Sequence, residues 1–274
     1  MRKQKKMQPG PIGVFDSGYG GLTVLKELRK KLPRYDYLYL GDNARSPYGT
    51  RSFDSVYHFT LECVKHLFEM KCRLVILACN TASAKALRSI QQNDLPKIDP
   101  TLRVLGVIRP TTEIVGNISK TKHVGVLGTT GTVASLSYPI EIEKFFPDVK
   151  VFQQACPMWV PLVENNEFNN EGADYFIQKN INELLSHSAK IDTIILGCTH
   201  YPVLIEKIKK ILPSTIKIIS QGELVANSLE DYLMRHPEME NVCSKNSTCT
   251  FLTTDSSGNF DEHAELFFGE KVLS

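Results

Sequence analysis

Two cysteines stand at matched positions in the sequence. Cys79 follows the apolar run at residues 74–78, Cys198 follows the similar run at residues 193–197, and each precedes a small polar residue. In a parallel α/β sheet, the junction between a strand and the next helix lies at the carboxyl edge, where ligands bind. The helix start offers free N–H groups and a partial positive charge, which favour a thiolate. We therefore predict a site with two poised thiols.

Two thiols on opposite sides of one carbon are suited to racemisation. One group must remove a weakly acidic α-proton and another must return a proton to the opposite face, so a thiolate and a thiol can exchange states in every turnover. Without a cofactor, the carbanion needs nearby hydrogen-bond donors and exclusion of water. Suitable donors are Ser17, Asn80, Thr81 and Thr199. No pyridoxal lysine motif or metal-ligand cluster competes, so we expect neither a cofactor nor a metal.

The loop at residues 16–21, with the sequence DSGYGG, is a candidate anion-binding segment. Its glycines permit close approach of the backbone to a ligand, but it matches neither the P-loop pattern nor G-x-G-x-x-G. An amino acid suits it better than a phosphate, because Asp16 can pair with an ammonium while Ser17 and N–H groups hold a carboxylate. A tight turn capped by Asp16 is the alternative.

The remaining cysteines and one histidine have competing interpretations. Packing as small buried hydrophobes is the expectation for four thiols, Cys63, Cys72, Cys243 and Cys249. Cys156, which precedes a proline, is equally compatible with packing and with lining a site. His200 lies two residues after Cys198, so we favour proton handling over a purely structural hydrogen bond.

Short runs rich in Val, Ile and Leu alternate with segments of helical periodicity, which indicates an α/β fold with parallel strands. The predicted strands are residues 12–16, 37–41, 74–78, 104–108, 123–127, 151–154, 193–196, 217–219 and 250–253. The predicted helices are residues 23–31, 52–70, 82–92, 173–185, 201–211, 222–235 and 260–267.

The sequence also repeats itself. Residues 12–18 resemble residues 124–130, an offset of 125 − 13 = 112, and residues 74–81 resemble residues 193–200, an offset of 198 − 79 = 119. Buried strands resemble one another in general, which could account for the first pair. The second pair also aligns the two cysteines, so we predict two related α/β halves.

Composition excludes several classes of function. The formal charge is +2, from 32 basic and 30 acidic residues, so nothing indicates nucleic acid binding. The basic cluster at residues 2–6 lacks a following apolar segment, so we expect a solvated terminus and not a secretory signal. No apolar run approaches the ~20 residues of a membrane span. Seven cysteines without a C-x-x-C pair favour reduced thiols in a cytoplasm.

Taken together, the motifs resemble glutamate racemase, of the aspartate/glutamate racemase superfamily. The resemblance runs in order from about residue 12 to residue 268. It rests on Asp16-Ser17-Gly18 with Gly20-Gly21, Pro47-Tyr48-Gly49, ACNTAS at 78–83, Cys156-Pro157 with PLVE at 161–164, and GCTHYP at 197–202.

The resemblance implies two pseudosymmetric α/β domains, residues 1–103 plus 214–274 and residues 104–213, with the substrate in the cleft between them. It implies cofactor-independent interconversion of L- and D-glutamate, which supplies D-glutamate for peptidoglycan synthesis in the cytoplasm, and a possible homodimer. The implied catalytic residues are Cys79, Cys198, Asp16, His200, Glu164 and Asp42. The implied substrate-binding residues are Asp16, Ser17, Pro47, Tyr48, Gly49, Asn80, Thr81, Thr129, Thr132, Thr199 and His200.

Two positions depart from the usual pattern of the resemblance. Tyr19 stands in the glycine-rich loop where a smaller residue is common, and Arg109 follows a predicted strand where a Pro-Gly step is more usual. Three alternatives stay open: a racemase of aspartate or a hydantoin, a non-catalytic amino-acid-binding module, and a thiol hydrolase. The hydrolase would leave one cysteine motif unexplained, and the binding module requires neither cysteine.

Overall fold

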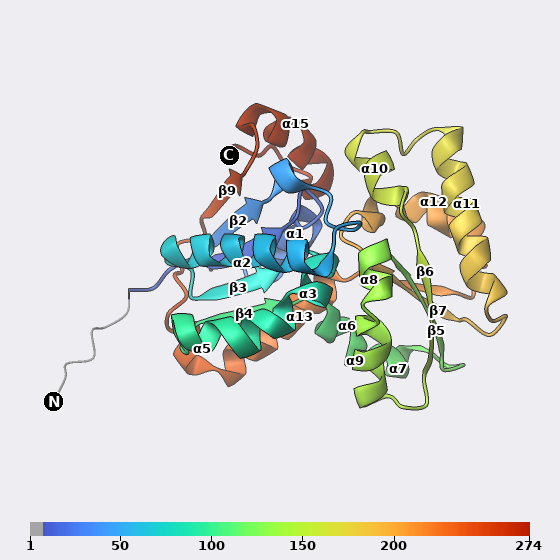
Figure 1. Ribbon diagram of the computed structural model, residues 1–274, viewed down its shortest axis with the longest axis horizontal. Helices are drawn as coiled ribbons and strands as arrows, with labels where there is room; N and C mark the ends of the chain where they lie inside the picture. Colours follow the sequence, from blue (N-terminus) through green and yellow to red (C-terminus); the bar gives the residue numbers. More distant parts are fainter. Residues whose placement is uncertain (1–7) are drawn as a thin grey trace.

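The computed structural model describes residues 8–274, and its strands form two parallel sheets that lie in two lobes (Figure 1). The first sheet has the order β4-β3-β1-β2-β9 and the second has the order β6-β5-β7-β8. The strands are β1 (Ile12–Asp16), β2 (Tyr37–Gly41), β3 (Leu74–Leu77), β4 (Arg103–Gly106), β5 (His123–Gly128), β6 (Lys150–Ala155), β7 (Thr193–Gly197), β8 (Lys217–Ile219) and β9 (Cys249–Thr253). The predicted α/β fold is confirmed. The basic cluster at residues 2–6 lies outside the described residues.

Helices flank both sheets and lie in the segments that connect successive strands. They are α1 (Leu22–Lys31), α2 (Phe53–Glu69), α3 (Asn80–Lys85), α4 (Leu87–Ser89), α5 (Leu95–Ile98), α6 (Ile108–Thr112), α7 (Val115–Ile118), α8 (Thr130–Ala134), α9 (Ser137–Phe145), α10 (Trp159–Glu164), α11 (Glu171–Ser186), α12 (Ile205–Ile211), α13 (Gly222–Arg235), α14 (Pro237–Glu240) and α15 (Ser257–Phe268). Short 3₁₀ turns are η1 (Asn43–Arg45) and η3 (Tyr201–Leu204), and η2 (Ile90–Asp94) is a π-helix. Among the described residues, no helix is long and apolar enough to cross a membrane.

The two sheets repeat the same strand order. β4-β3-β1-β2 in the first sheet corresponds to β8-β7-β5-β6 in the second, and β9 is added at one edge. The register agrees as well, because Gly13 pairs with Val75 and Gly125 pairs with Ile194. These pairs differ by 125 − 13 = 112 and 194 − 75 = 119, the two offsets of the sequence repeat. The repeat is therefore a repeat of structure.

All nine predicted strands are present, with ends that differ by at most two residues. The predicted helix at 82–92 is wrong as a single helix: it starts earlier, because Cys79 caps α3, and it is interrupted by the π-helix at Ile90–Asp94. The predicted strand at 104–108 ends at Gly106, because Ile108 begins α6. Five short helices of the second lobe were not predicted, α6 to α10.

The chain crosses between the sheets twice. β4 pairs with β3 in the first sheet and β8 pairs with β7 in the second. The domain division expected from the sequence, at 103/104 and 213/214, would assign most of β4 and all of β8 to the opposite halves. We propose instead that the boundaries lie after Gly106 and after Ile219.

Candidate active site

Cys79 lies at the end of β3 and caps the first turn of α3. Its sulfur accepts a hydrogen bond from the Ala82 N–H at 3.4 Å and donates to Ser17 Oγ at 3.5 Å. Burial, and next the negative charge of Asp16, raise the pKa of Cys79 to about 12, although the bonds to Ser17 and Ala82 oppose this. The helix start thus acts in the expected direction but is outweighed by burial. Cys79 is a thiol at neutral pH.

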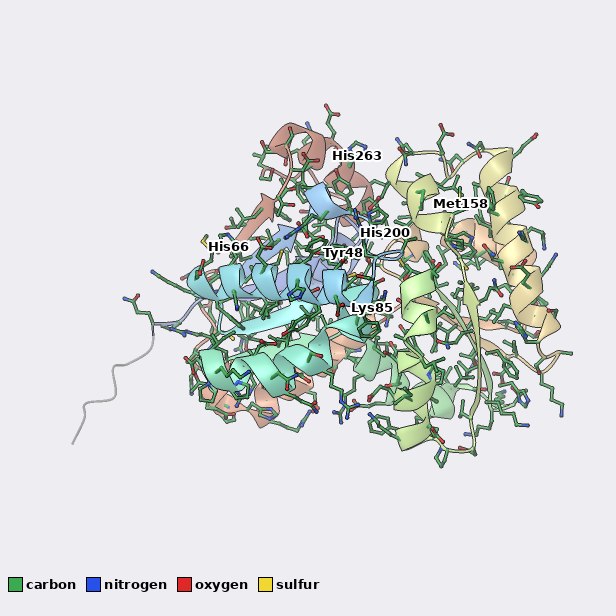
Figure 2. All side chains as sticks on the ribbon, in the orientation of Figure 1. Tyr48, His66, Lys85, Met158, His200 and His263 are labelled. Carbon is green, nitrogen blue, oxygen red and sulfur yellow. The ribbon has the colours of Figure 1, made fainter. Side chains whose placement is uncertain are left out.

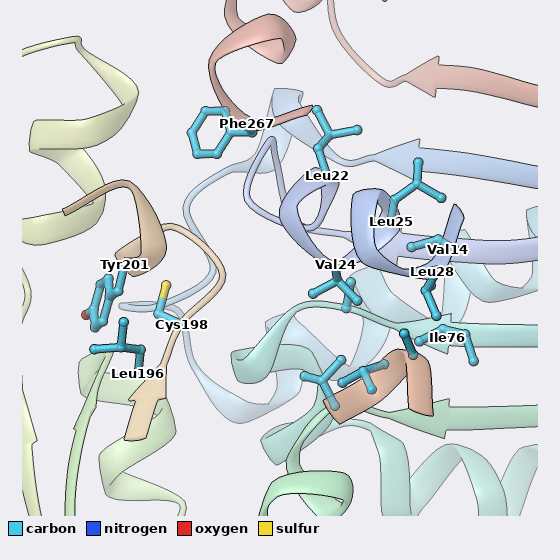
Figure 3. Close-up of a cluster of buried hydrophobic side chains, with 14 of the residues drawn as sticks. Val14, Leu22, Val24, Leu25, Leu28, Ile76, Leu196, Cys198, Tyr201 and Phe267 are labelled. Carbon is cyan, nitrogen blue, oxygen red and sulfur yellow. The ribbon is translucent and has the colours of Figure 1, made fainter. Parts of the chain in front are cut away.

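Cys198 lies at the end of β7, and its neighbouring groups are His200 and, through His200, Glu164. Its sulfur is 3.8 Å from His200 Nδ1, and His200 Nε2 is 3.0 Å from Glu164 Oε1. Burial opposes a charge on His200, but the contacts with Cys198 and Glu164 raise its pKa well above the usual value. The three groups form a Cys–His–Glu chain with a protonated imidazole in the middle. Figures 2 and 3 show His200 between the lobes and Cys198 beside Leu196 and Tyr201.

Glu164 completes this chain as a carboxylate. Burial raises its pKa, but the hydrogen bond and the charge of His200 outweigh burial, so the pKa of Glu164 is lowered overall. Ser46 Oγ from the first lobe also donates to Glu164 Oε1, at 3.1 Å. Ser46 was not predicted, because nothing in the sequence marks a serine that meets a residue 118 positions away.

Asp16 lies at the end of β1, next to the Cys79 side of the site. It is completely buried, accepts a hydrogen bond from the Gly18 N–H at 2.9 Å, and accepts another from Thr199 Oγ1 at 3.3 Å. Burial raises the pKa of Asp16 and the positive charge of His200 opposes that rise. The contact with Thr199 joins the two lobes, so Asp16 touches the motif of the second cysteine.

A second group of contacts between the lobes involves hydroxyls. Thr81 Oγ1 is 2.9 Å from Thr129 Oγ1 and 3.4 Å from Thr132 Oγ1, and Thr129 caps the first turn of α8. The Gly131 N–H donates to the Gly49 carbonyl at 2.7 Å. A Cβ at Gly49 would lie 2.9 Å from Thr129 Cβ, so only glycine permits this approach. The structure thus brings these predicted residues together.

Asp42 and Tyr48 belong to the loop that follows β2, where their hydrogen bonds are made within the first lobe. Tyr48 donates to Asp42 through a short hydrogen bond, Arg45 Nε reaches both carboxylate oxygens at 2.7 and 3.0 Å, and Thr254 Oγ1 adds a third donor at 2.8 Å. The Tyr48 ring packs against core aromatic residues. Pro47 follows Ser46 through a cis peptide bond in the same loop. The catalytic role expected for Asp42 stays a prediction, and its contacts favour a structural one.

Asn80 has two buried partners that sequence reasoning missed. Its Nδ2 donates to Gln221 Oε1 at 2.7 Å, and its Oδ1 accepts from the Tyr138 hydroxyl at 2.7 Å. Gln221 lies just after β8 and Tyr138 lies on α9. No motif connects these positions along the chain, so only the fold reveals the contact.

The other thiols lie in packed surroundings. Burial raises the pKa of Cys63, Cys72 and Cys243 to about 12, as expected for inert packing residues. Cys156 is also buried, and its carbonyl accepts a hydrogen bond from the Tyr201 hydroxyl at 3.2 Å. Cys249 is partly buried. Within residues 8–274 all seven cysteines are free.

Tyr19 and Arg109, the two positions that depart from the usual pattern, lie in different parts of the structure. Tyr19 stacks on Phe260, His263 and Phe267 of α15, so this helix packs against the glycine-rich loop at residues 16–21. Arg109 forms an exposed ion pair with Glu113 at 2.7 Å. In the part of the chain that the structure describes, no cluster of three His, Cys, Asp or Glu side chains could hold a metal.

The fold and the site define a two-lobed α/β enzyme with buried acid–base groups contributed by both lobes. The family model for Asp/Glu/hydantoin racemases matches residues 12–229. The chain is 40% identical to a glutamate racemase of Bacillus cereus, over 95% of this chain and 94% of that protein.

Solved structures agree with the sequence comparison. A glutamate racemase isoform of Bacillus anthracis superposes with a TM-score of 0.87 at 34% identity and 96% coverage of both chains. A glutamate racemase of Francisella tularensis, solved in complex with D-glutamate, gives 0.84 at 33% identity, covering 96% of this chain and 95% of that one. The chain belongs to the Asp/Glu/hydantoin racemase family. It is an amino-acid racemase.

Proposed function

We propose that this racemase interconverts L- and D-glutamate by a two-base mechanism in which Cys79 and Cys198 act on opposite faces of the α-carbon. The observation that carries the proposal is the pairing of two buried thiols at equivalent strand ends, each with its own acid–base partners. Asp16 and Ser17 stand near Cys79, and His200 stands at Cys198.

The different surroundings of the two cysteines give the proposed mechanism a direction. Cys79 is a thiol, whereas the sulfur of Cys198 lies 3.8 Å from Nδ1 of the protonated His200 imidazole. In turnover of L-glutamate, the Cys198 thiolate takes the α-proton, and the Cys79 thiol gives its proton to the opposite face. The cysteines have then exchanged states, and D-glutamate reacts in the reverse sense.

The polar groups of the site suit an amino acid with two carboxylates. Asp16 pairs with the ammonium, while Asn80, Thr81 and Thr199 supply neutral donors that stabilise the charge developing on the α-carboxylate. We assign binding of the second carboxylate to Ser17 and the loop at residues 47–49. The glutamate racemases among the relatives support glutamate over aspartate.

The biological role that we propose is the supply of D-glutamate for peptidoglycan precursors, and thus for the cell wall and cell shape. A mechanism that depends on two free thiols fits a reducing compartment, so we place the enzyme in the cytoplasm. The bacterial glutamate racemases among its relatives support this role.

Circular dichroism of L-glutamate and of L-aspartate, each incubated with the protein and no cofactor, tests the proposal. The ellipticity of glutamate should decay to zero, whereas that of aspartate should persist. Cys79→Ala and Cys198→Ala should each stop the decay, and Cys72→Ala, which removes a buried thiol of the first-lobe core, should not. Decay with aspartate alone would reject glutamate as the substrate.

A further inference from the structure

A buried hydrogen-bond network joins Asn80 to both points where the chain crosses between the sheets. Gln221, just after the second crossing, donates through Nε2 to the Val107 carbonyl, just after the first, at 2.9 Å. The same Nε2 donates to the Tyr138 hydroxyl at 2.9 Å. Asn80 donates to Gln221 Oε1, and Tyr138 donates to Asn80 Oδ1. The three side chains and the Val107 carbonyl all belong to buried residues.

The Val107 carbonyl fixes the direction of every bond in this network. A backbone carbonyl only accepts, so the side-chain amide of Gln221 must turn its NH₂ toward Val107 and its oxygen toward Asn80. Asn80 must then present its NH₂ to Gln221 and its oxygen to Tyr138. A tyrosine hydroxyl can both accept and donate, so Tyr138 completes the circuit without conflict.

We propose that Gln221 and Tyr138 are positioning residues that set the orientation of the Asn80 amide for catalysis. Asn80 uses one N–H of Nδ2 to bind Gln221 and its Oδ1 to accept from Tyr138, so the second N–H of Nδ2 is the donor that we assign to the substrate α-carboxylate. The inference rests on the proposed function, because it takes Asn80 as a donor to glutamate. A reversed amide would present an oxygen to the carboxylate and repel it.

The location of the network explains why an orienting device is needed there. Asn80 directly follows Cys79, one of the proposed bases, and is the first residue of α3. The groups that hold it come from α9 in the second lobe and from the two crossing segments. The donor is therefore set by the junction of the lobes and not by its own helix alone.

A fixed donor of this kind acts mainly on the transition state. Negative charge moves onto the carboxylate as the α-proton leaves, so an aligned N–H strengthens during the reaction. Loss of alignment should lower kcat more than it raises KM. One hydrogen bond to a charged group corresponds to a loss of about 10- to 100-fold.

Gln221→Met is the direct test. Methionine keeps the length of the side chain but removes the amide, and the Tyr138 hydroxyl alone can accept from or donate to Asn80, so the direction is lost. We expect kcat for L-glutamate to fall about 10- to 100-fold. Tyr37→Phe is the matched control, since the buried Tyr37 hydroxyl donates to the carbonyls of Leu28 and Leu32 within the first lobe. It should lower the melting temperature and leave kcat unchanged.

A double-variant cycle with Asn80→Ala separates positioning from a general loss of structure. If Gln221 acts through Asn80, adding Gln221→Met to the Asn80→Ala variant should not lower kcat any further. Losses that multiply in the double variant would overturn the inference. If Gln221→Met does not fold, Tyr138→Phe enters the same cycle, with a smaller loss expected because Gln221 still orients the amide.

An assay of the unmodified protein distinguishes failure of the positioning role from failure of the proposed function. Turnover of glutamate by the unmodified protein together with multiplying losses would reject only the positioning role. Absence of glutamate turnover by the unmodified protein would reject the proposed function and this inference with it.

Discussion

Cys79 and Cys198 occupy equivalent strand ends but have different neighbours. Cys79 is held by Ser17 and the Ala82 N–H near a buried carboxylate, whereas Cys198 faces an imidazole that Glu164 keeps protonated. The sequence predicted the two thiols because the repeat aligned them. It could not predict their opposite charge environments, since these depend on residues brought in from other elements, such as Glu164 and Ser46.

Replacement of His200 or Asp16 by asparagine tests the acid–base partners. His200→Asn removes the positive charge beside Cys198, and Asp16→Asn removes the carboxylate near Cys79, so each should lower kcat about 10²- to 10⁴-fold. Initial rates of racemisation with each enantiomer provide the measurement, and an unchanged melting temperature is the control for folding. Wild-type rates in both variants would leave these residues with structural roles only.

The raised pKa of Cys79 predicts how stability responds to alkaline pH. The folded state holds this proton up to pH of about 12, whereas an unfolded thiol releases it near 9, so the unfolded state binds fewer protons in that window. Stability must therefore fall as pH rises, by at most about 1.4 kcal/mol per pH unit for this group.

Cys79→Ala removes that contribution. Denaturant unfolding at pH 8 and at pH 10 should show a smaller loss of stability in the variant than in the unmodified protein. Cys72→Ala provides a comparison, because the pKa of Cys72 is raised by burial in the same way. An identical pH dependence in Cys79→Ala and the unmodified protein would contradict the protonated resting state.

At the scale of elements, strands were easier to predict than helices. Most strands contain a short run of apolar residues, and β1, β2, β3 and β7 are buried along their whole length, which leaves few alternatives for such a run. Helices α6, α7, α8 and α10 have only four to six residues and lack a full amphipathic repeat, so their periodicity could not be recognised. α9 is longer, but no capping side chain marks its start after Leu136. The end of β4 at Gly106 was missed for another reason, because the apolar Val107 and Ile108 continue the apolar run of the strand into α6.

Gly49→Ala tests the contact between the loop after β2 and α8. The added methyl group would meet Thr129 Cβ at 2.9 Å and Cγ2 at 3.0 Å, so loop and helix must separate and the Gly131–Gly49 hydrogen bond must lengthen. We expect kcat/KM to fall about tenfold or more, since small displacements of positioned groups are costly. Gly258→Ala is the control, because a Cβ there meets open space. Equal kinetics in the two variants would show that this approach is not needed.

At the scale of the molecule, the proposed active site follows from the structural repeat. Each sheet ends one strand with a cysteine, and the two crossings of the chain bring those ends together, so each lobe supplies one proposed base. The sequence predicted this arrangement from two offsets in the chain. The roles of Gln221 and Tyr138 could not be predicted, because no sequence motif connects them to Asn80. Their contacts with Asn80 form only when the chain crosses between the sheets.

The central claim is that two different groups act on the two faces of the α-carbon, and hydrogen isotopes test it most directly. Racemisation of L-glutamate is followed in D₂O by NMR or mass spectrometry at low conversion. If Cys198 removes the proton and Cys79 delivers one already exchanged with solvent, nearly all early D-glutamate should carry deuterium at the α-carbon, while unreacted L-glutamate stays largely protiated. Early D-glutamate that retained most of its original α-hydrogen would mean that one base serves both faces, which would contradict the two-cysteine mechanism.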